Sequence, residues 1–321
     1  MKSKGKISSL TAKKLFITLG VSSAVAVVLR IVQLFTIIDD ENTGFYDTIN
    51  WSVYVLYAVL GVSIVLLFAL ARMSGKITAS RPVIMKNRAM GIGAFVMAAG
   101  IAYDVIIMLS IFIKAFTMYS PELEVKFLQY FMTNGLFAIG LEAVCGLIAC
   151  IYMIMFGLSY IDGKTTFREY KLLALMPLFW AMFRMVYRFM TKISFTQVSD
   201  LLFELFMLAF MMLFFMSFAR ISSEMATKGE MRRLVSFGLP GILLAVLIGI
   251  TRLVVTVGGR SELLPANFGF SLADIAFPVF AIIYINVQMK FGRPASEDDL
   301  LDQGQNEELS YNKTDDNFLE D

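Results

Sequence analysis

Eight long runs of apolar residues, separated by short polar segments, dominate the pattern of this sequence. A helix that crosses the hydrocarbon core of a bilayer needs about 20 mostly apolar residues, and each run is close to that length or longer. The pattern therefore predicts eight transmembrane helices, over Leu15–Ile38, Trp51–Ala71, Ala89–Ile113, Leu128–Leu158, Leu172–Met190, Leu201–Ala219, Leu234–Gly258 and Phe268–Met289.

The continuity of these runs determines the fold class. Only helices and closed barrels satisfy the backbone in hydrocarbon, and barrel strands would be segments of about 10 residues with alternating polarity. We therefore predict an all-α, polytopic membrane protein, one domain of residues 1–290. Its eight helices would form four antiparallel hairpins, over 15–71, 89–158, 172–219 and 234–289. The composition agrees, because 58% of the residues are hydrophobic, more than the roughly 45–50% of soluble domains.

The positive charges predict the orientation. Twenty of the 28 Lys and Arg residues lie in the two termini and in the loops that would share a side with them, and four lie in the other loops. Basic residues concentrate in cytoplasmic loops, so we expect both termini in the cytoplasm. We expect the membrane to be a bacterial inner membrane, with lipid as the surrounding partner.

The two ends of the chain differ from the rest. The first run follows a basic segment, and Ala24–Ala26 imitates a signal-peptidase site, but apolar residues continue to Ile38, so we expect an uncleaved anchor. Residues 291–321 carry ten acidic side chains and few apolar ones, which is typical of a disordered tail. This acidic cytoplasmic tail would be a solubilising terminus or a docking segment for a cytosolic partner.

Charged residues inside the predicted helices are the candidate functional residues. Such groups are costly in a bilayer and normally face a bundle interior or an aqueous cavity. They fall at one depth, in the outer half of the predicted bundle, and the candidates for a substrate site are Arg30, Arg184, Arg252, Asp104, Glu142, Glu204 and Asp274.

Two interpretations of these charges remain open. They could be ion pairs between helices that fix packing. Alternatively, they could line an outward-opening polar cavity in which the arginines bind an anionic group, while the acids hold counter-charges or take up protons.

Helical spacing gives a specific prediction. Arg184 and Arg188 are four residues apart and share a helix face, as do Asp200 and Glu204. We predict that the two faces meet and that one or both arginines pair with the acids. Arg188 and Asp200 lie near the predicted outer surface, where they could instead snorkel to the interface or cap a helix.

Other features indicate packing rather than chemistry. Pro177, Pro240 and Pro278 fall inside predicted helices and are expected to kink them. The pairs Gly91/Gly93 and Gly135/Gly140 would allow close helix contacts. The short pattern around Arg30, Arg184 and Arg252 suggests a duplicated hairpin. The two cysteines, Cys145 and Cys150, would be packing residues rather than a redox pair.

The sequence also excludes several function classes. It has no histidine, which removes His-dependent serine hydrolases and His-ligated metal sites, and it has no Walker-type phosphate loop. We expect no enzymatic activity, no cofactor, no metal and no nucleic-acid partner.

The expected function is that of a secondary transporter or solute-binding protein for a small anionic or zwitterionic solute, with a proton as a further candidate ligand. The alternative is a non-catalytic membrane scaffold or sensor in which the same charges are structural and the acidic tail binds a partner. The oligomeric state does not follow from the sequence.

Overall fold

The computed structural model describes the greater part of the chain. The residues described are 3–38, 46, 50–73, 79–83, 86–117, 127–133, 135–163, 170–190, 198–227, 229–264 and 269–294. The predicted disordered tail over 291–321 begins too early, because Phe291 ends α9 and Arg293–Pro294 form β2. The rest of that tail, 295–321, and most of the loops between the helices lie outside the described residues.

Helices make up nearly all of the described structure, which confirms the all-α fold class. The described residues contain eight helical segments long and apolar enough to cross a membrane. The long helices are α1 (Ser3–Thr36), α2 (Trp51–Met73), α3 (Arg88–Thr117), α5 (Leu136–Asp162), α6 (Met176–Met190), α7 (Val198–Ser222), α8 (Glu230–Val257) and α9 (Ala273–Phe291). The short elements are α4 (Phe127–Thr133), the 3₁₀ turns η2 (Lys171–Leu175) and η3 (Ser261–Leu263), and the strands β1 (Ala79–Arg81) and β2 (Arg293–Pro294).

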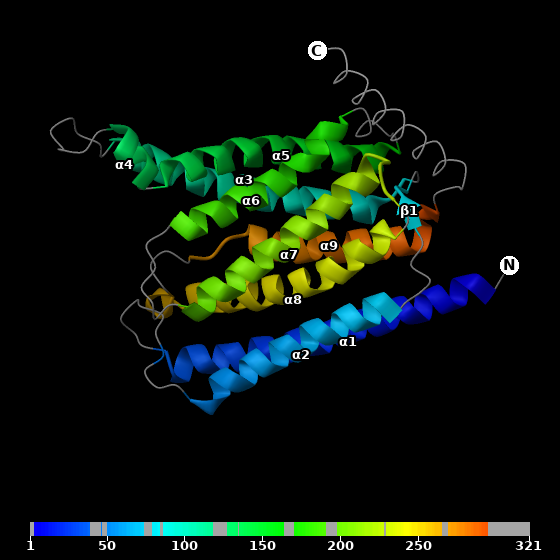
Figure 1. The fold of residues 1–321 in the computed structure, drawn as a ribbon, viewed down its shortest axis with the longest axis horizontal. Helices are drawn as coiled ribbons and strands as arrows, with labels where there is room; N and C mark the ends of the chain where they lie inside the picture. Colours follow the sequence, from blue (N-terminus) through cyan, green and yellow to red (C-terminus); the bar gives the residue numbers. More distant parts are fainter. Residues whose placement is uncertain are drawn as a thin grey trace, which may run out of the picture.

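The long helices form an elongated bundle around α8. Consecutive long helices run in opposite directions (Figure 1), and the two helices of each predicted hairpin pack against one another. Helix α8 packs against α1, α2, α7 and α9, while α3, α5 and α6 form the side away from α1 and α2. As the most enclosed helix of the bundle, α8 presents buried residues on almost every face.

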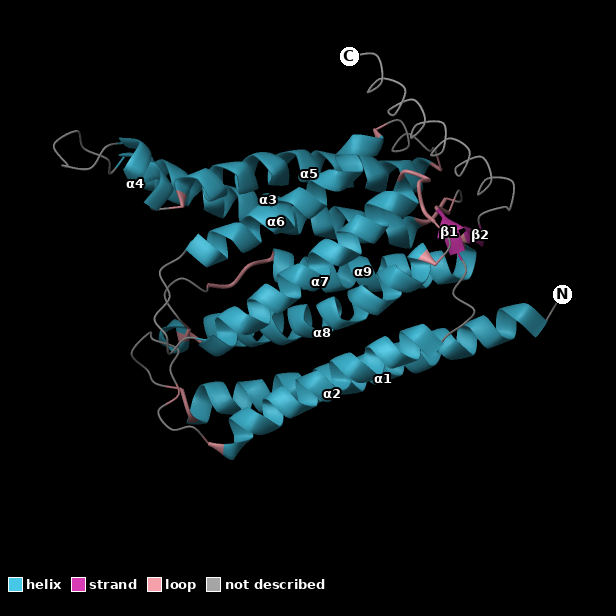
Figure 2. Cartoon of the chain, in the orientation of Figure 1, coloured by secondary structure: helices cyan, strands magenta, loops and turns pink. Residues whose placement is uncertain are grey.

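The start of α1 and the β1–β2 pair lie at one end of the bundle (Figure 2), which we call the terminal end. Strands β1 and β2 are antiparallel and join the segment after α2 to the segment after α9. The opposite end holds the last turns of α1, α6 and α8 and the first turns of α7 and α9.

The side chains follow the rule for helices in an apolar solvent. Apolar residues such as Val28, Val62 and Ile106 are exposed on the outer faces, where lipid would cover them. The interior is filled by aromatic rings packed edge to face, including Phe218 against Phe280 with ring centroids 5.5 Å apart. The exposed apolar surface and the aromatic core are consistent with a multi-pass membrane protein.

Several predicted boundaries shift, and α1, for example, begins at Ser3 rather than Leu15. The run Leu128–Leu158 is not one helix, because Gly135 adopts a left-handed conformation (φ 68°) that ends α4 and precedes α5. Pro177 lies inside the fifth helical span, as predicted, at the point where the 3₁₀ turn η2 passes into α6. The last helix begins at Ala273 rather than Phe268.

Glycine contacts set the spacing of several helices. A Cβ on Gly91 would lie 2.7 Å from Cγ1 of Ile161, and one on Gly93 would lie 3.1 Å from Cδ1 of Ile283, which confirms the predicted close contacts there. Gly140 makes only an ordinary contact, with Phe112. Cys145 and Cys150 are free thiols, both half-buried in α5.

Candidate charged site

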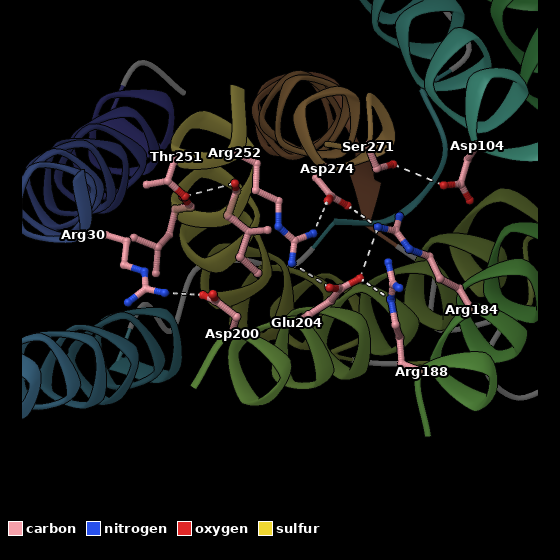
Figure 3. A network of polar contacts seen from close by, with 12 residues as sticks. Arg30, Asp104, Arg184, Arg188, Asp200, Glu204, Thr251, Arg252, Ser271 and Asp274 are labelled. Carbon is pink, nitrogen blue, oxygen red and sulfur yellow. Dashed lines mark hydrogen bonds and ion pairs between the residues drawn. The ribbon is translucent and has the colours of Figure 1, made fainter. Parts of the chain in front are cut away.

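Nine ionisable side chains from seven helices lie at one level of the bundle, and we call this set the charge layer. It is made up of Arg30, Asp104, Glu142, Arg184, Arg188, Asp200, Glu204, Arg252 and Asp274. Figure 3 shows the members of this set other than Glu142 and the contacts between them. All seven residues predicted as site candidates are buried, with at most 4% of each exposed.

Glu204 is the centre of the charge layer. Its carboxylate accepts a hydrogen bond from Arg188 Nε at 2.8 Å and another from Arg252 Nη2 at 2.8 Å. Arg184 Nη2 lies 3.5 Å from the same carboxylate. One buried acid on α7 therefore binds arginines from both α6 and α8.

Asp274 completes this arrangement from α9. It accepts a hydrogen bond from Arg184 Nη2 at 2.7 Å, and its other oxygen lies 3.7 Å from Arg252 Nη1. Arg184 and Arg252 thus each bridge the two acids, Glu204 and Asp274, so that α6, α7, α8 and α9 are linked by a single set of ion pairs (Figure 3).

Arg30 and Asp200 form a separate pair at the edge of the charge layer. Arg30 Nη2 donates to Asp200 Oδ1 at 2.5 Å, and Arg30 Nη1 donates to the hydroxyl of Tyr46 at 2.6 Å. Gln33, one turn along α1, anchors this region by donating to the carbonyl of Ser52. The Asp200 side chain is 18% exposed, which makes this pair the most accessible part of the layer.

A small pocket joins this pair to the central ion pairs. Arg30, Asp200, Thr251 and Arg252 contribute polar groups to its wall, together with apolar residues such as Phe203. Its accessible volume is about 10 Å³, which is close to what one water molecule requires. In this conformation the pocket is too small for a solute.

Asp104 and Glu142 lie on the other side of the charge layer. Asp104 accepts hydrogen bonds from Trp180 Nε1 at 3.1 Å and from Ser271 Oγ at 3.2 Å. No described donor is hydrogen-bonded to either oxygen of Glu142, although the residue is only 1% exposed. Two nitrogens of Arg184, Nε and Nη1, also lack an acceptor among the described residues.

The predicted meeting of a basic and an acidic face is confirmed for Glu204, which binds both Arg184 and Arg188. Asp200 instead pairs with Arg30, which is 170 residues away in the sequence. Arg188 does not snorkel to an interface. It is 6% exposed and donates to Glu204.

Sequence reasoning missed the neutral partners of these charges. Trp180 shares a face of α6 with Arg184, four residues on, so helical spacing could have connected it to the layer. Ser271 and Tyr46 lie outside the long helices, where no periodic pattern indicates the direction of a side chain.

A further buried acid lies near the terminal end, outside the charge layer. Glu230, in the first turn of α8, is 1% exposed and accepts a hydrogen bond from Ser217 Oγ at 2.9 Å. Arg233 and Arg220 lie 3.3 and 3.5 Å from its other oxygen. Because both arginines are partly exposed, we interpret this cluster as an anchor for the start of α8.

Metal binding has no support among the described residues, which contain no group of three or more Cys, Asp or Glu side chains arranged to hold an ion. The buried ion pairs can recognise charge. Guanidinium groups present planar sets of donors that fit carboxylate and phosphate oxygens, and the acids next to them can exchange protons.

Comparisons of the chain with protein-family models, with curated proteins and with solved structures found no match. Its class therefore rests on its own structure. Eight long apolar helices that carry apolar side chains on their outer faces characterise the chain as an integral membrane protein.

Proposed function

We propose that the protein is a secondary transporter for a small anionic or zwitterionic solute and that the charge layer is its binding region in a closed conformation. The observation that carries this proposal is the buried concentration of guanidinium groups around Glu204 and Asp274. In the closed conformation these two acids occupy the arginines that a solute anion would otherwise bind.

Packing alone is a weak explanation for so many buried charges. Buried ion pairs often contribute little net stability compared with apolar residues of similar volume, because desolvation offsets the attraction. In lipid, where apolar packing is easily achieved, intramembrane charges mark ligand or ion pathways more often than they mark packing devices. Two nitrogens of Arg184 without an acceptor add to this argument, since a purely structural arrangement would be fully paired.

The proposed route into the layer runs past Arg30 and Asp200. Their ion pair lies at the wall of the small pocket that also reaches Arg252. Helix α1 packs with α2 as a hairpin against α8 and contacts α9 less extensively, and the Arg30–Asp200 pair joins this hairpin to α7. We propose that a displacement of this hairpin separates Arg30 from Asp200 and widens the pocket toward Arg252.

Thiol labelling tests this proposal without knowledge of the solute. Thr251 lines the pocket, so Thr251→Cys is introduced with Cys145→Ala and Cys150→Ala, and membrane vesicles are treated with a membrane-impermeant maleimide. Val257→Cys, which is 79% exposed at the end of the same helix, is the positive control, and Ala245→Cys, which is buried, is the negative control.

A transporter samples an open conformation, so Thr251→Cys should react more slowly than the exposed control and measurably faster than the buried one. If it reacts no faster than Ala245→Cys, the pocket does not open and the transport proposal is wrong.

The second candidate is a non-catalytic scaffold or sensor. It is favoured by a specific observation, namely that all four arginines of the charge layer make ion pairs and that the pocket beside them has room for about one water molecule. In that case the charges hold the helices together, Thr251→Cys stays protected, and the acidic tail recruits a cytosolic partner. Both candidates share an orientation with cytoplasmic termini in a bacterial inner membrane, and neither requires catalysis.

A further inference from the structure

The contact between α3 and α5 brings two acids together at the side of the charge layer away from α1. A Cβ on Gly146 would lie 2.5 Å from Cγ2 of Val105 and 2.9 Å from Cδ1 of Trp180, so the absence of a side chain there allows the two helices and the indole to approach closely. Glu142 is one turn before Gly146 on α5, and Asp104 precedes Val105 on α3. The close approach brings α3 and α5 together at this level, and the Asp104 and Glu142 side chains interact across the contact.

The two acids have very different partners. Asp104 is held by two donors, the indole N–H of Trp180 and the hydroxyl of Ser271, which suits a carboxylate. Glu142 is 1% exposed and accepts no hydrogen bond from a described donor, and its carboxyl interacts with that of Asp104. Two ionised carboxylates in such a contact repel each other, whereas one proton between them turns the repulsion into a hydrogen bond.

We propose that Asp104 and Glu142 form a proton-binding site in which Glu142 carries the proton and its O–H donates a hydrogen bond to Asp104. The step is a simple exchange: the proton enters from water, forms the O–H bond of Glu142 and leaves to water again, and no electrons are transferred. The charges of the layer support this assignment. Its four arginines face five acids, so a single proton makes the layer neutral.

The surroundings couple this proton to the ion pairs. On α6, Arg184, Tyr187 and Arg188 interact electrostatically with Glu142. Ser271, just before α9, donates to Asp104, and Asp274, in the first turn of α9, accepts a hydrogen bond from Arg184.

Loss of the proton would place a second negative charge close to Arg184 and compete with Asp274 for its guanidinium group. This consequence, in which proton release loosens the closed ion pairs, rests on the proposed transport function. The proton site itself does not.

Trp180 is a built-in reporter for the test. The chain has two tryptophans, and Trp51, which is 72% exposed, is replaced by Trp51→Phe. Trp180 emission from the purified full-length protein is then recorded up to about pH 9, below the range in which tyrosine titrates. Because the indole N–H of Trp180 is hydrogen-bonded to Asp104, we expect the emission of Trp180 to shift as the proposed site binds or releases its one proton.

Two variants in the Trp51→Phe background make the test specific. Glu142→Gln is nearly isosteric with the protonated acid and is expected to fold and to abolish the titration, while Glu262→Gln, which alters an acid outside the long helices, should leave it intact. Infrared difference spectra should show the C=O band of a protonated carboxylic acid in the parent and not in Glu142→Gln. The proposal would be overturned by any of three results. These are a Trp180 emission that does not titrate, a titration that survives in Glu142→Gln, and the absence of that infrared band from the parent.

The two proposals can fail separately. If Trp180 titrates through Glu142 but Thr251→Cys is never labelled, the proton site stands and transport is wrong. If Thr251→Cys is labelled but the emission of Trp180 is independent of pH, transport stands and the proton site is wrong.

Discussion

Arg30 and Asp200 are 170 residues apart in the sequence, and their side chains are joined at 2.5 Å. The pair connects the α1–α2 hairpin to the start of α7, at the wall of a pocket that reaches Arg252. It is also the part of the charge layer with the most exposed acid. A link that is partly exposed and isolated from the central ion pairs is well placed to break and re-form.

Breaking this pair is expected to be tolerated. Asp200→Asn leaves Arg30 with Tyr46 and Gln33 as partners, so the variant should express and remain monodisperse in detergent. We expect a coupling energy of about 0.5–3 kcal/mol between Arg30→Ala and Asp200→Ala, measured from thermal or denaturant unfolding of both single variants and the double variant. Strictly additive effects would show that the two side chains do not interact.

Glu204 is expected to be far less tolerant. Glu204→Gln removes the charge that three buried arginines share, and breaking a buried ion pair by removing one partner costs roughly 3–5 kcal/mol. Expression and the midpoint of thermal unfolding, compared with Glu262→Gln, measure this effect. A Glu204→Gln protein as stable as that control would contradict the central position of Glu204.

The contact between α3 and α9 gives a prediction about packing. A Cβ on Gly100 would lie 2.5 Å from Cβ of Ala276 and 3.1 Å from Cα of Ala273, so Gly100→Ala must push α9, and with it Asp274, away from α3. We expect a loss of about 1–3 kcal/mol in the free energy of unfolding. Gly61→Ala is the matched control, because nothing lies within 4 Å of its Cβ position, and its stability should be unchanged or slightly higher.

The predicted orientation can be tested with reporter fusions. The imbalance of Lys and Arg between the two sets of loops should place a C-terminal green fluorescent protein in the cytoplasm, where it fluoresces. Alkaline phosphatase fused after Leu263, between α8 and α9, should be active, because it would lie outside the cytoplasm. The opposite pattern of activities would reverse the orientation of the bundle.

The sequence predicts the fold well, because a membrane-spanning helix requires a long, continuous run of apolar residues, and such a run is easy to detect. The prediction failed where a backbone conformation rather than hydropathy decides the outcome. Gly135 divides the fourth apolar run because of its positive φ, and an apolar run around a glycine has no feature that distinguishes a break from a continuous helix. The change from the 3₁₀ turn η2 to α6 at Met176 is a related case, since hydropathy does not show it.

The charge layer was predictable in its members and depth but only partly in its pairings. Spacing along one helix and its neighbour was enough to bring Arg184 and Arg188 to Glu204. It was insufficient for Arg30 and Asp200, because nothing local to α1 or α7 indicates that these two helices approach one another. Neutral partners such as Trp180 carry no charge that would single them out among the many aromatic residues.

If the charge layer opens through the Arg30–Asp200 pair, access to the pocket must depend on that pair. The rate at which an impermeant maleimide labels Thr251→Cys is compared with and without Asp200→Asn. Weakening the closed pair by ~1.4 kcal/mol would raise the open population, and therefore the labelling rate, about tenfold. We predict an increase of that order, with no change at Val257→Cys. An equal labelling rate of Thr251→Cys with and without Asp200→Asn would show that the Arg30–Asp200 pair does not control access to the pocket.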